Sequence, residues 1–116
     1  MMINTSRGSF ECKTVRETLA HLQSGEEIWI SGNEPYPCLA VVINDDFAAV
    51  HYFENEDGAM WLSFNEKNDK EVTFIAGGEQ WTPEAEAVIT LDKAALCIKE
   101  FGTTYQRPSC IQWQEL

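Results

Sequence analysis

Histidine and cysteine are the residue types in this chain that could carry acid–base, nucleophilic or metal chemistry. His21 falls in a segment of helical periodicity and His51 in a predicted strand, and neither has a cysteine or carboxylate at metal-ligand spacing. His51 lies between Val50 and Tyr52, so it could face either side of a sheet. The nucleophile motifs G-x-S-x-G and S-x-x-K are absent from the sequence. We therefore expect no catalytic residue, no metal and no cofactor, and a surface or structural role for His51.

The four cysteines are Cys12, Cys38, Cys97 and Cys110. No pair has C-x-x-C spacing, which argues against a zinc site or a redox motif. The first residues contain no apolar core of a signal peptide, and the longest nearly uncharged run, residues 35–44, is too short to span a bilayer. We expect a cytoplasmic protein whose cysteines stay reduced and behave as small core hydrophobes.

Charge is the unusual property of the composition. Nineteen Asp and Glu residues oppose eight Lys and Arg residues, which gives a net charge of −11. Such a balance repels nucleic acid and anionic membranes, and it attracts basic partners and speeds their encounter. The alternative is that the acidic surface serves only solubility. We expect no direct contact with nucleic acid or membrane.

Two segments have the periodicity and capping residues of helices. Thr14 and Glu17 have capping-box spacing, which predicts a short helix over residues 15–24. Thr90 is the predicted N-cap of a second helix near the C-terminus. Their apolar faces comprise Val15, Leu19 and Leu22 in the first and Ala94, Ala95, Ile98 and Phe101 in the second. The glycines expected to end the two helices are Gly25 and Gly102.

The segments between and around these helices have strand composition. The clearest strands are residues 27–31, 38–44, 47–54, 60–64 and 71–76, with an edge strand within 3–13 and a closing strand over 111–116. Residues 84–89 are expected to be a short extended piece. Strands joined by such short connections must be antiparallel. The sequence predicts one α+β domain over residues 1–116, with an antiparallel sheet of about five to seven strands and two helices packed on it.

Acidic and aromatic residues alternate in the middle of the chain, at successive strand ends. Protein interfaces combine aromatic anchors, which supply affinity, with charges that raise the association rate. The predicted partner-binding residues are Asp45, Asp46, Tyr52, Glu54, Glu56, Asp57, Trp61 and Glu66. The alternative is that the rings are core and the acids are solvated turns, because only half of the side chains of a strand face outward.

The C-terminal half resembles a known family. An acid-and-proline segment, residues 83–94, leads into the second helix, which ends with Phe and Gly at 101–104, and an R-P…W segment at 107–115 closes the domain. With the hairpin over residues 47–64, these motifs resemble the first immunity-protein family of bacterial polymorphic-toxin systems. The resemblance spans residues 28–116, whereas the first 25 residues match no pattern that we identify.

The resemblance implies a cytosolic antidote that binds a cognate toxin and is not an enzyme. Toxins paired with this family are typically nucleases or nucleic-acid deaminases, whose basic substrate sites suit an acidic inhibitor. It also implies that Phe101 and Trp113 hold the fold together. Two alternatives remain open from the residues themselves: a small hydrolase or isomerase using His51 with a carboxylate, and an acidic adaptor that has no toxin partner.

Overall fold

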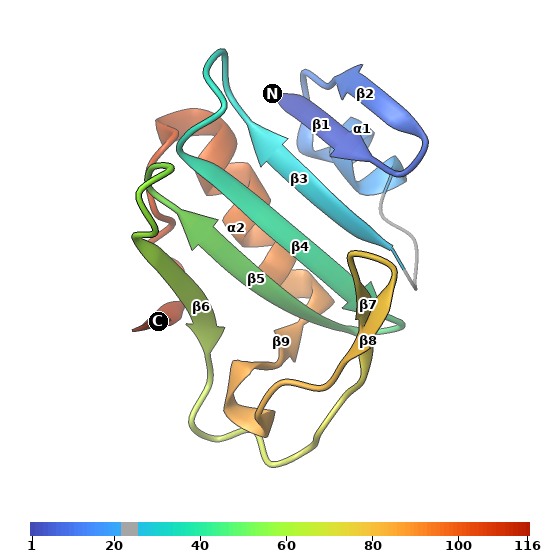
Figure 1. Ribbon diagram of the computed structural model, residues 1–116, viewed down its shortest axis with the longest axis vertical. Coiled ribbons are helices and arrows are strands. Elements are labelled where there is room, and N and C mark those ends of the chain that lie inside the picture. The colour runs from blue at the N-terminus through green and yellow to red at the C-terminus, as the bar shows by residue number, and fades with distance from the viewer. Residues whose placement is uncertain (22–25) are drawn as a thin grey trace.

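The computed structural model describes residues 1–21 and 26–116. Within them, eight antiparallel strands form the main sheet in the order β10-β6-β5-β4-β3-β1-β2, with β9 beside β5, and β7 and β8 form a separate hairpin (Figure 1). The strands are β1 (Met2–Thr5), β2 (Gly8–Glu11), β3 (Glu27–Ser31), β4 (Cys38–Asn44), β5 (Phe47–Phe53), β6 (Met60–Phe64), β7 (Phe74–Ala76), β8 (Glu79–Trp81), β9 (Ile89–Thr90) and β10 (Gln112–Glu115). The helices are α1 (Val15–Ala20), α2 (Leu91–Thr104) and the 3-10 turn η1 (Ala85–Ala87). The predicted α+β class is confirmed.

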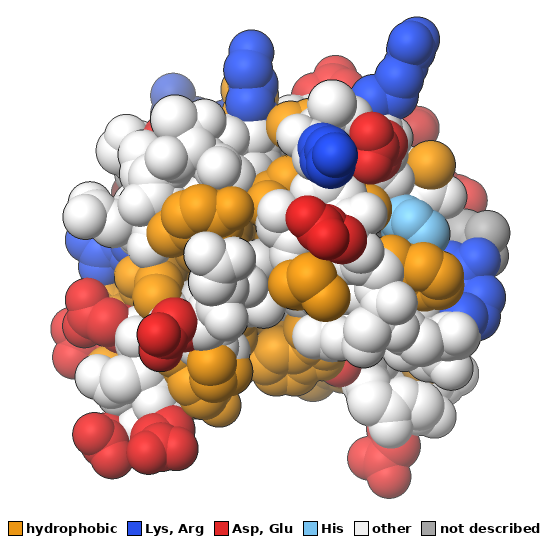
Figure 2. Space-filling view, turned by 90° about the horizontal axis from the view of Figure 1, so that it is seen from above, with side chains coloured by type: hydrophobic (Ala, Val, Ile, Leu, Met, Phe, Trp, Pro, Cys, Tyr) orange, Lys and Arg blue, Asp and Glu red, His pale blue; other side chains and the backbone are white. Residues whose placement is uncertain are grey.

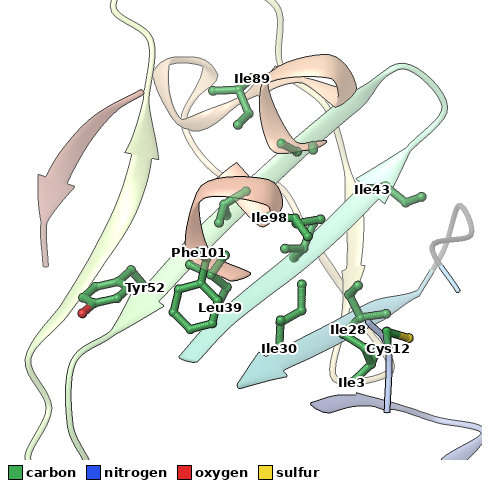
Figure 3. Close-up of a cluster of buried hydrophobic side chains, with 14 residues drawn as sticks. Ile3, Cys12, Ile28, Ile30, Leu39, Ile43, Tyr52, Ile89, Ile98 and Phe101 are labelled. Atoms are coloured by element: carbon green, nitrogen blue, oxygen red, sulfur yellow. The ribbon is translucent and has the colours of Figure 1, made fainter. Parts of the chain in front are cut away.

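The main core lies between one face of the sheet and the helices. The central strand β4 is apolar throughout except at its last residue, and Leu39, Val41 and Ile43 point to the helical side. Figure 3 shows Ile98 and Phe101 of α2 packed against this layer of strand side chains. Neither helix among the described residues is long and apolar enough to cross a membrane.

Helix α2 begins as predicted and ends later than predicted. The Thr90 hydroxyl accepts a hydrogen bond from the Lys93 amide at 3.3 Å, which confirms the N-cap. Gly102 lies inside the helix, and the C-cap is Tyr105 in the left-handed conformation (φ 51°). A Cβ on Gly102 would lie 2.7 Å from the Met1 sulfur, so this glycine allows close packing and does not end the helix.

The first helix is capped as predicted, with one difference. The Thr14 hydroxyl accepts from the Glu17 amide at 3.1 Å. The Glu17 carboxylate accepts from the Lys13 amide at 3.1 Å, whereas in a capping box the donor would be the amide of Thr14. The prediction of one edge strand within residues 3–13 is wrong, because the chain turns at Ser6 and forms β1 and β2. The predicted helix positions 22–25, including Leu22 and Gly25, lie outside the described residues.

The hairpin of β7 and β8 covers part of the second face of the sheet. Gly77 and Gly78 both have positive φ, 60° and 84°, and join the two strands in a tight turn. The sequence predicted a strand over residues 71–76 that stops at the glycines; β7 covers only Phe74–Ala76, and β8 was not predicted. The extended piece predicted for residues 84–89 instead contains η1. The hairpin and η1 bury a second cluster, which comprises Val42, Ala49, Leu62, Val72, Phe74, Ala87 and Val88.

Candidate partner-binding surface

The face of the sheet opposite the helices is only partly covered. Cross-strand partners in a sheet share a face, and the register places Trp29, Ala40, His51 and Leu62 in one row. The next row on the same face comprises Ser31, Cys38, Phe53 and Met60. We call these two rows together the open face. Alternate residues of the same strands belong to the helical core.

Aromatic rings form a continuous ladder across the open face. The ring centroids of Trp29 and Phe53 are 5.3 Å apart, those of Phe53 and His51 5.8 Å, and those of His51 and Trp81 5.3 Å. Trp29 is 37% exposed, and the other three rings are half-buried. The Trp29 indole N–H donates to the Glu27 carboxylate at 3.2 Å. The ladder therefore joins β3 and β5 to the hairpin and presents its Trp29 end to solvent.

Three recesses adjoin this ladder. One of about 600 Å³ contains His51 and Trp81, one of about 520 Å³ lies beside Trp29 and the Gly77–Gly78 turn, and one of about 380 Å³ lies between Trp29 and Tyr36. Figure 2 shows hydrophobic side chains in a hollow along its lower edge, between two protrusions that carry acidic side chains. This side of the molecule is the one that carries the hairpin and faces away from α2 (Figure 1).

The rim of these recesses is acidic. The carboxylates that line them are Glu26, Glu27, Glu34, Glu79 and Glu84. Of the residues that the structure describes, no lysine or arginine lines any of the three recesses. Arg7 pairs with the rim carboxylate of Glu26 at 3.3 Å, whereas Lys93 and Lys99 lie on the exposed surface of α2 on the opposite side. The open face thus combines partly exposed rings with a mainly acidic rim, the composition of a surface that binds a cationic protein.

His51 is held in this surface by ring contacts. Burial lowers the pKa of His51 below its usual value of 6.5, so the neutral imidazole is favoured. Glu79 and Glu84 line the same recess, but in the described part of the chain the imidazole makes no hydrogen bond to a carboxylate. The described residues also contain no group of three His, Cys, Asp or Glu that could hold a metal ion.

The two predicted aromatic anchors lie on the other face of the sheet. Tyr52 is 3% exposed and belongs to the main core, so its ring is inaccessible to a partner. Trp61 is half-buried, its ring lies 5.7 Å from that of Tyr52, and the Arg107 guanidinium lies over it at 4.9 Å. The rings that do face outward, Trp29 and Phe53, were not among the predicted anchors. Side chains alternate between the two faces along the strand that contains Phe53, but the sequence alone did not show which of the two faces is buried.

The predicted acidic residues divide between the two ends of the sheet. Asp45 and Asp46 form the β4–β5 turn, whereas Glu54, Glu56 and Asp57 belong to the β5–β6 connection. Glu66 follows β6 and returns to the first end. Strand β5 separates the two groups by roughly 20 Å, at about 3.3 Å per residue. The acids at the two ends of β5 therefore do not form a single patch.

An acidic α+β domain whose sheet face carries partly exposed aromatic rings has the composition of a protein-binding domain. The family model of Immunity protein Imm1 matches residues 9–115. The chain belongs to this immunity protein family, which confirms the resemblance and extends it into the N-terminal residues. A search of curated proteins found no match. Membership implies that the partner is a cognate toxin.

Proposed function

We propose that this immunity protein neutralises its toxin in the cytoplasm by stoichiometric binding, without catalysis, and that the open face is the contact surface. The observation that carries the proposal is the aromatic ladder within an acidic rim. Aromatic residues in partly desolvated positions supply most of the affinity of protein interfaces, and a surrounding polar rim excludes water.

We further propose that the toxin is basic and acts on nucleic acid, as a nuclease or a deaminase. An enzyme that binds a polyanion presents a positive surface to it. A domain with a net charge of −11 competes for that surface and associates quickly. Protection against a lethal enzyme requires a dissociation constant in the nanomolar range or below, which corresponds to about 12 kcal/mol of binding free energy.

Co-expression with the product of the adjacent upstream gene tests this function. We expect the chain to restore growth of cells that make that product, and to co-purify with it. A toxin that kills equally well with and without the chain, and does not co-purify with it, would contradict the proposal. The purified pair should also show inhibition that is complete at equimolar protein, because a stoichiometric inhibitor does not turn over.

A further inference from the structure

We infer that the open face receives arginine side chains of a basic segment of the partner, one on the Trp29 ring and one in the recess beside His51 and Trp81. The inference rests on the proposed function, because it specifies which chemistry of the toxin this surface recognises. It is carried by two places on the open face where an exposed or half-buried ring lies beside a carboxylate.

The first place is the Trp29 ring. This indole is 37% exposed, it stacks on Phe53 at 5.3 Å, and its N–H is bonded to the Glu27 carboxylate at 3.2 Å. The stacking and the hydrogen bond hold the ring in one orientation before a partner arrives. A guanidinium that lies on its exposed surface can stack on the ring and donate a hydrogen bond to Glu27.

The second place is the recess of about 600 Å³ that contains His51, Trp81, Glu79 and Glu84. The His51 and Trp81 rings are 5.3 Å apart and tilted by 32°, and they form one wall. The two carboxylates supply hydrogen-bond acceptors at the rim. The neutral imidazole, favoured by burial, adds no positive charge that would repel a cation.

The two places are close enough for a single segment of the partner. Trp29 is on β3 and His51 on β5, with β4 between them, so two strand spacings of about 4.8 Å separate the backbones. Two arginines a few residues apart can therefore reach both places. Such a segment is expected in a protein that binds nucleic acid.

Arginine fits this surface better than other partner residues. Its planar guanidinium stacks on aromatic faces, donates two parallel hydrogen bonds to a carboxylate and is more weakly hydrated than the ammonium of lysine. An aromatic or aliphatic occupant would leave the rim carboxylates partly desolvated without a partner. An acidic occupant would be repelled by the rim carboxylates, of which only Glu26 has a cationic partner, Arg7, among the described residues.

The test measures the affinity of the toxin for four variants of the full chain. Trp29→Ala and Glu27→Gln remove the ring and the charge of the first place. Leu96→Ala and Glu115→Gln are the matched controls, since Leu96 is 54% exposed on α2 and Glu115 is exposed and paired with Trp61 on the far side of the sheet. We expect the dissociation constant to rise about tenfold for Trp29→Ala, severalfold for Glu27→Gln and less than twofold for the controls. Thermal unfolding checks that each variant is folded at the temperature of the binding assay.

Peptide probes separate arginine recognition from general charge attraction. Hexa-arginine should bind more tightly than hexalysine and should shift the Trp29 indole N–H resonance, and Trp29→Ala should remove the difference between the two peptides. Equal binding of both peptides, or toxin binding unaffected by Trp29→Ala and Glu27→Gln, would overturn this inference. Toxin neutralisation that survives both substitutions leaves the immunity function intact and contradicts only the placement of the contact, whereas absence of any binding to the toxin overturns the function itself.

Discussion

Ser63 connects three segments through one buried hydroxyl. Its Oγ accepts a hydrogen bond from the Val50 amide at 3.0 Å and donates to the Ala87 carbonyl at 2.7 Å. The hydroxyl thereby continues the pairing of β5 with β6 and attaches η1 to the sheet. Because η1 also covers the second hydrophobic cluster, this single side chain helps to position the wall of the open face.

Replacement of Ser63 by alanine should destabilise the protein. The Val50 N–H and the Ala87 carbonyl would both lose their partner in a buried site, and an unsatisfied buried polar group costs about 1–3 kcal/mol. Urea unfolding of Ser63→Ala measures this loss. Ser6→Ala, in the exposed β1–β2 turn, is the control and should change the free energy of unfolding by less than about 0.5 kcal/mol. Equal stability of the two variants would contradict the role of the hydroxyl.

His51 should make the stability of the domain depend on pH. Its pKa in the folded protein lies below that in the unfolded chain because burial disfavours the imidazolium. The unfolded chain therefore binds more protons between the two pKa values, and stability falls as pH decreases below about 6.5. Unfolding free energies measured at pH 7.5 and pH 5 should differ less in His51→Gln than in the natural chain. An unchanged difference would show that His51 does not contribute.

Elements with a strong local signal could be predicted from the sequence. Strands β3, β4 and β6 have the predicted bounds because β-branched and aromatic runs are bounded there by turn residues. The N-cap at Thr90 likewise depends on nearby residues only. Elements that depend on distant contacts differ from the prediction: α2 continues past Gly102, which lies against Met1, and β8 pairs with β7.

The candidate surface was harder to predict than the fold. Tyr52 and Phe53 are adjacent aromatic residues of one strand, so one of them must face the helices. Which one does so depends on where α2 packs, and that is a tertiary property. Trp29 and Trp81 are far from Phe53 in the chain and join it only through the sheet order and the hairpin. No local sequence pattern could therefore have predicted the ladder.

The β7–β8 hairpin depends on its two turn glycines. Gly78 has φ 84°, and a residue with a Cβ in a left-handed conformation costs about 1–2 kcal/mol. Gly78→Ala should therefore lower the melting temperature and displace Trp81 from His51, seen as changed ring chemical shifts. Gln80→Ala, at an exposed position of β8, is the control. A Gly78→Ala protein with the stability and ring shifts of the control would contradict this role of the turn.

At the scale of the molecule, negative charge is present at both ends of the sheet as well as around the open face. The acids of the β4–β5 and β5–β6 connections are close in sequence and are separated by the length of β5. Charges that do not touch a partner still raise its association rate through the long-range field. We therefore expect the two acidic groups to contribute to the association rate even where they lie outside the contact.

Charge reversal tests that expectation separately at each end. Asp45→Lys with Asp46→Lys changes one end, and Glu56→Lys with Asp57→Lys changes the other. Each pair should lower the association rate with the toxin severalfold at low salt and weaken its dependence on salt, because attraction between unlike charges is screened. Stopped-flow rates at several salt concentrations measure both effects. If one double substitution also lowers the affinity at high salt, the acids at that end of the sheet belong to the contact itself. If neither double substitution changes the association rate, these acids have no steering role.

The four tryptophans are distributed in a way that gives the molecule its own optical probe. Trp29 and Trp81 belong to the ladder, whereas Trp61 lies beneath Arg107 and the Trp113 indole N–H is bonded to the Pro108 carbonyl at 2.7 Å. Only the surroundings of Trp29 and Trp81 would change from water to protein when a partner binds. The tryptophan fluorescence should therefore shift in wavelength when a partner binds to the ladder, while the contribution of the other two indoles stays constant. No attached dye is needed.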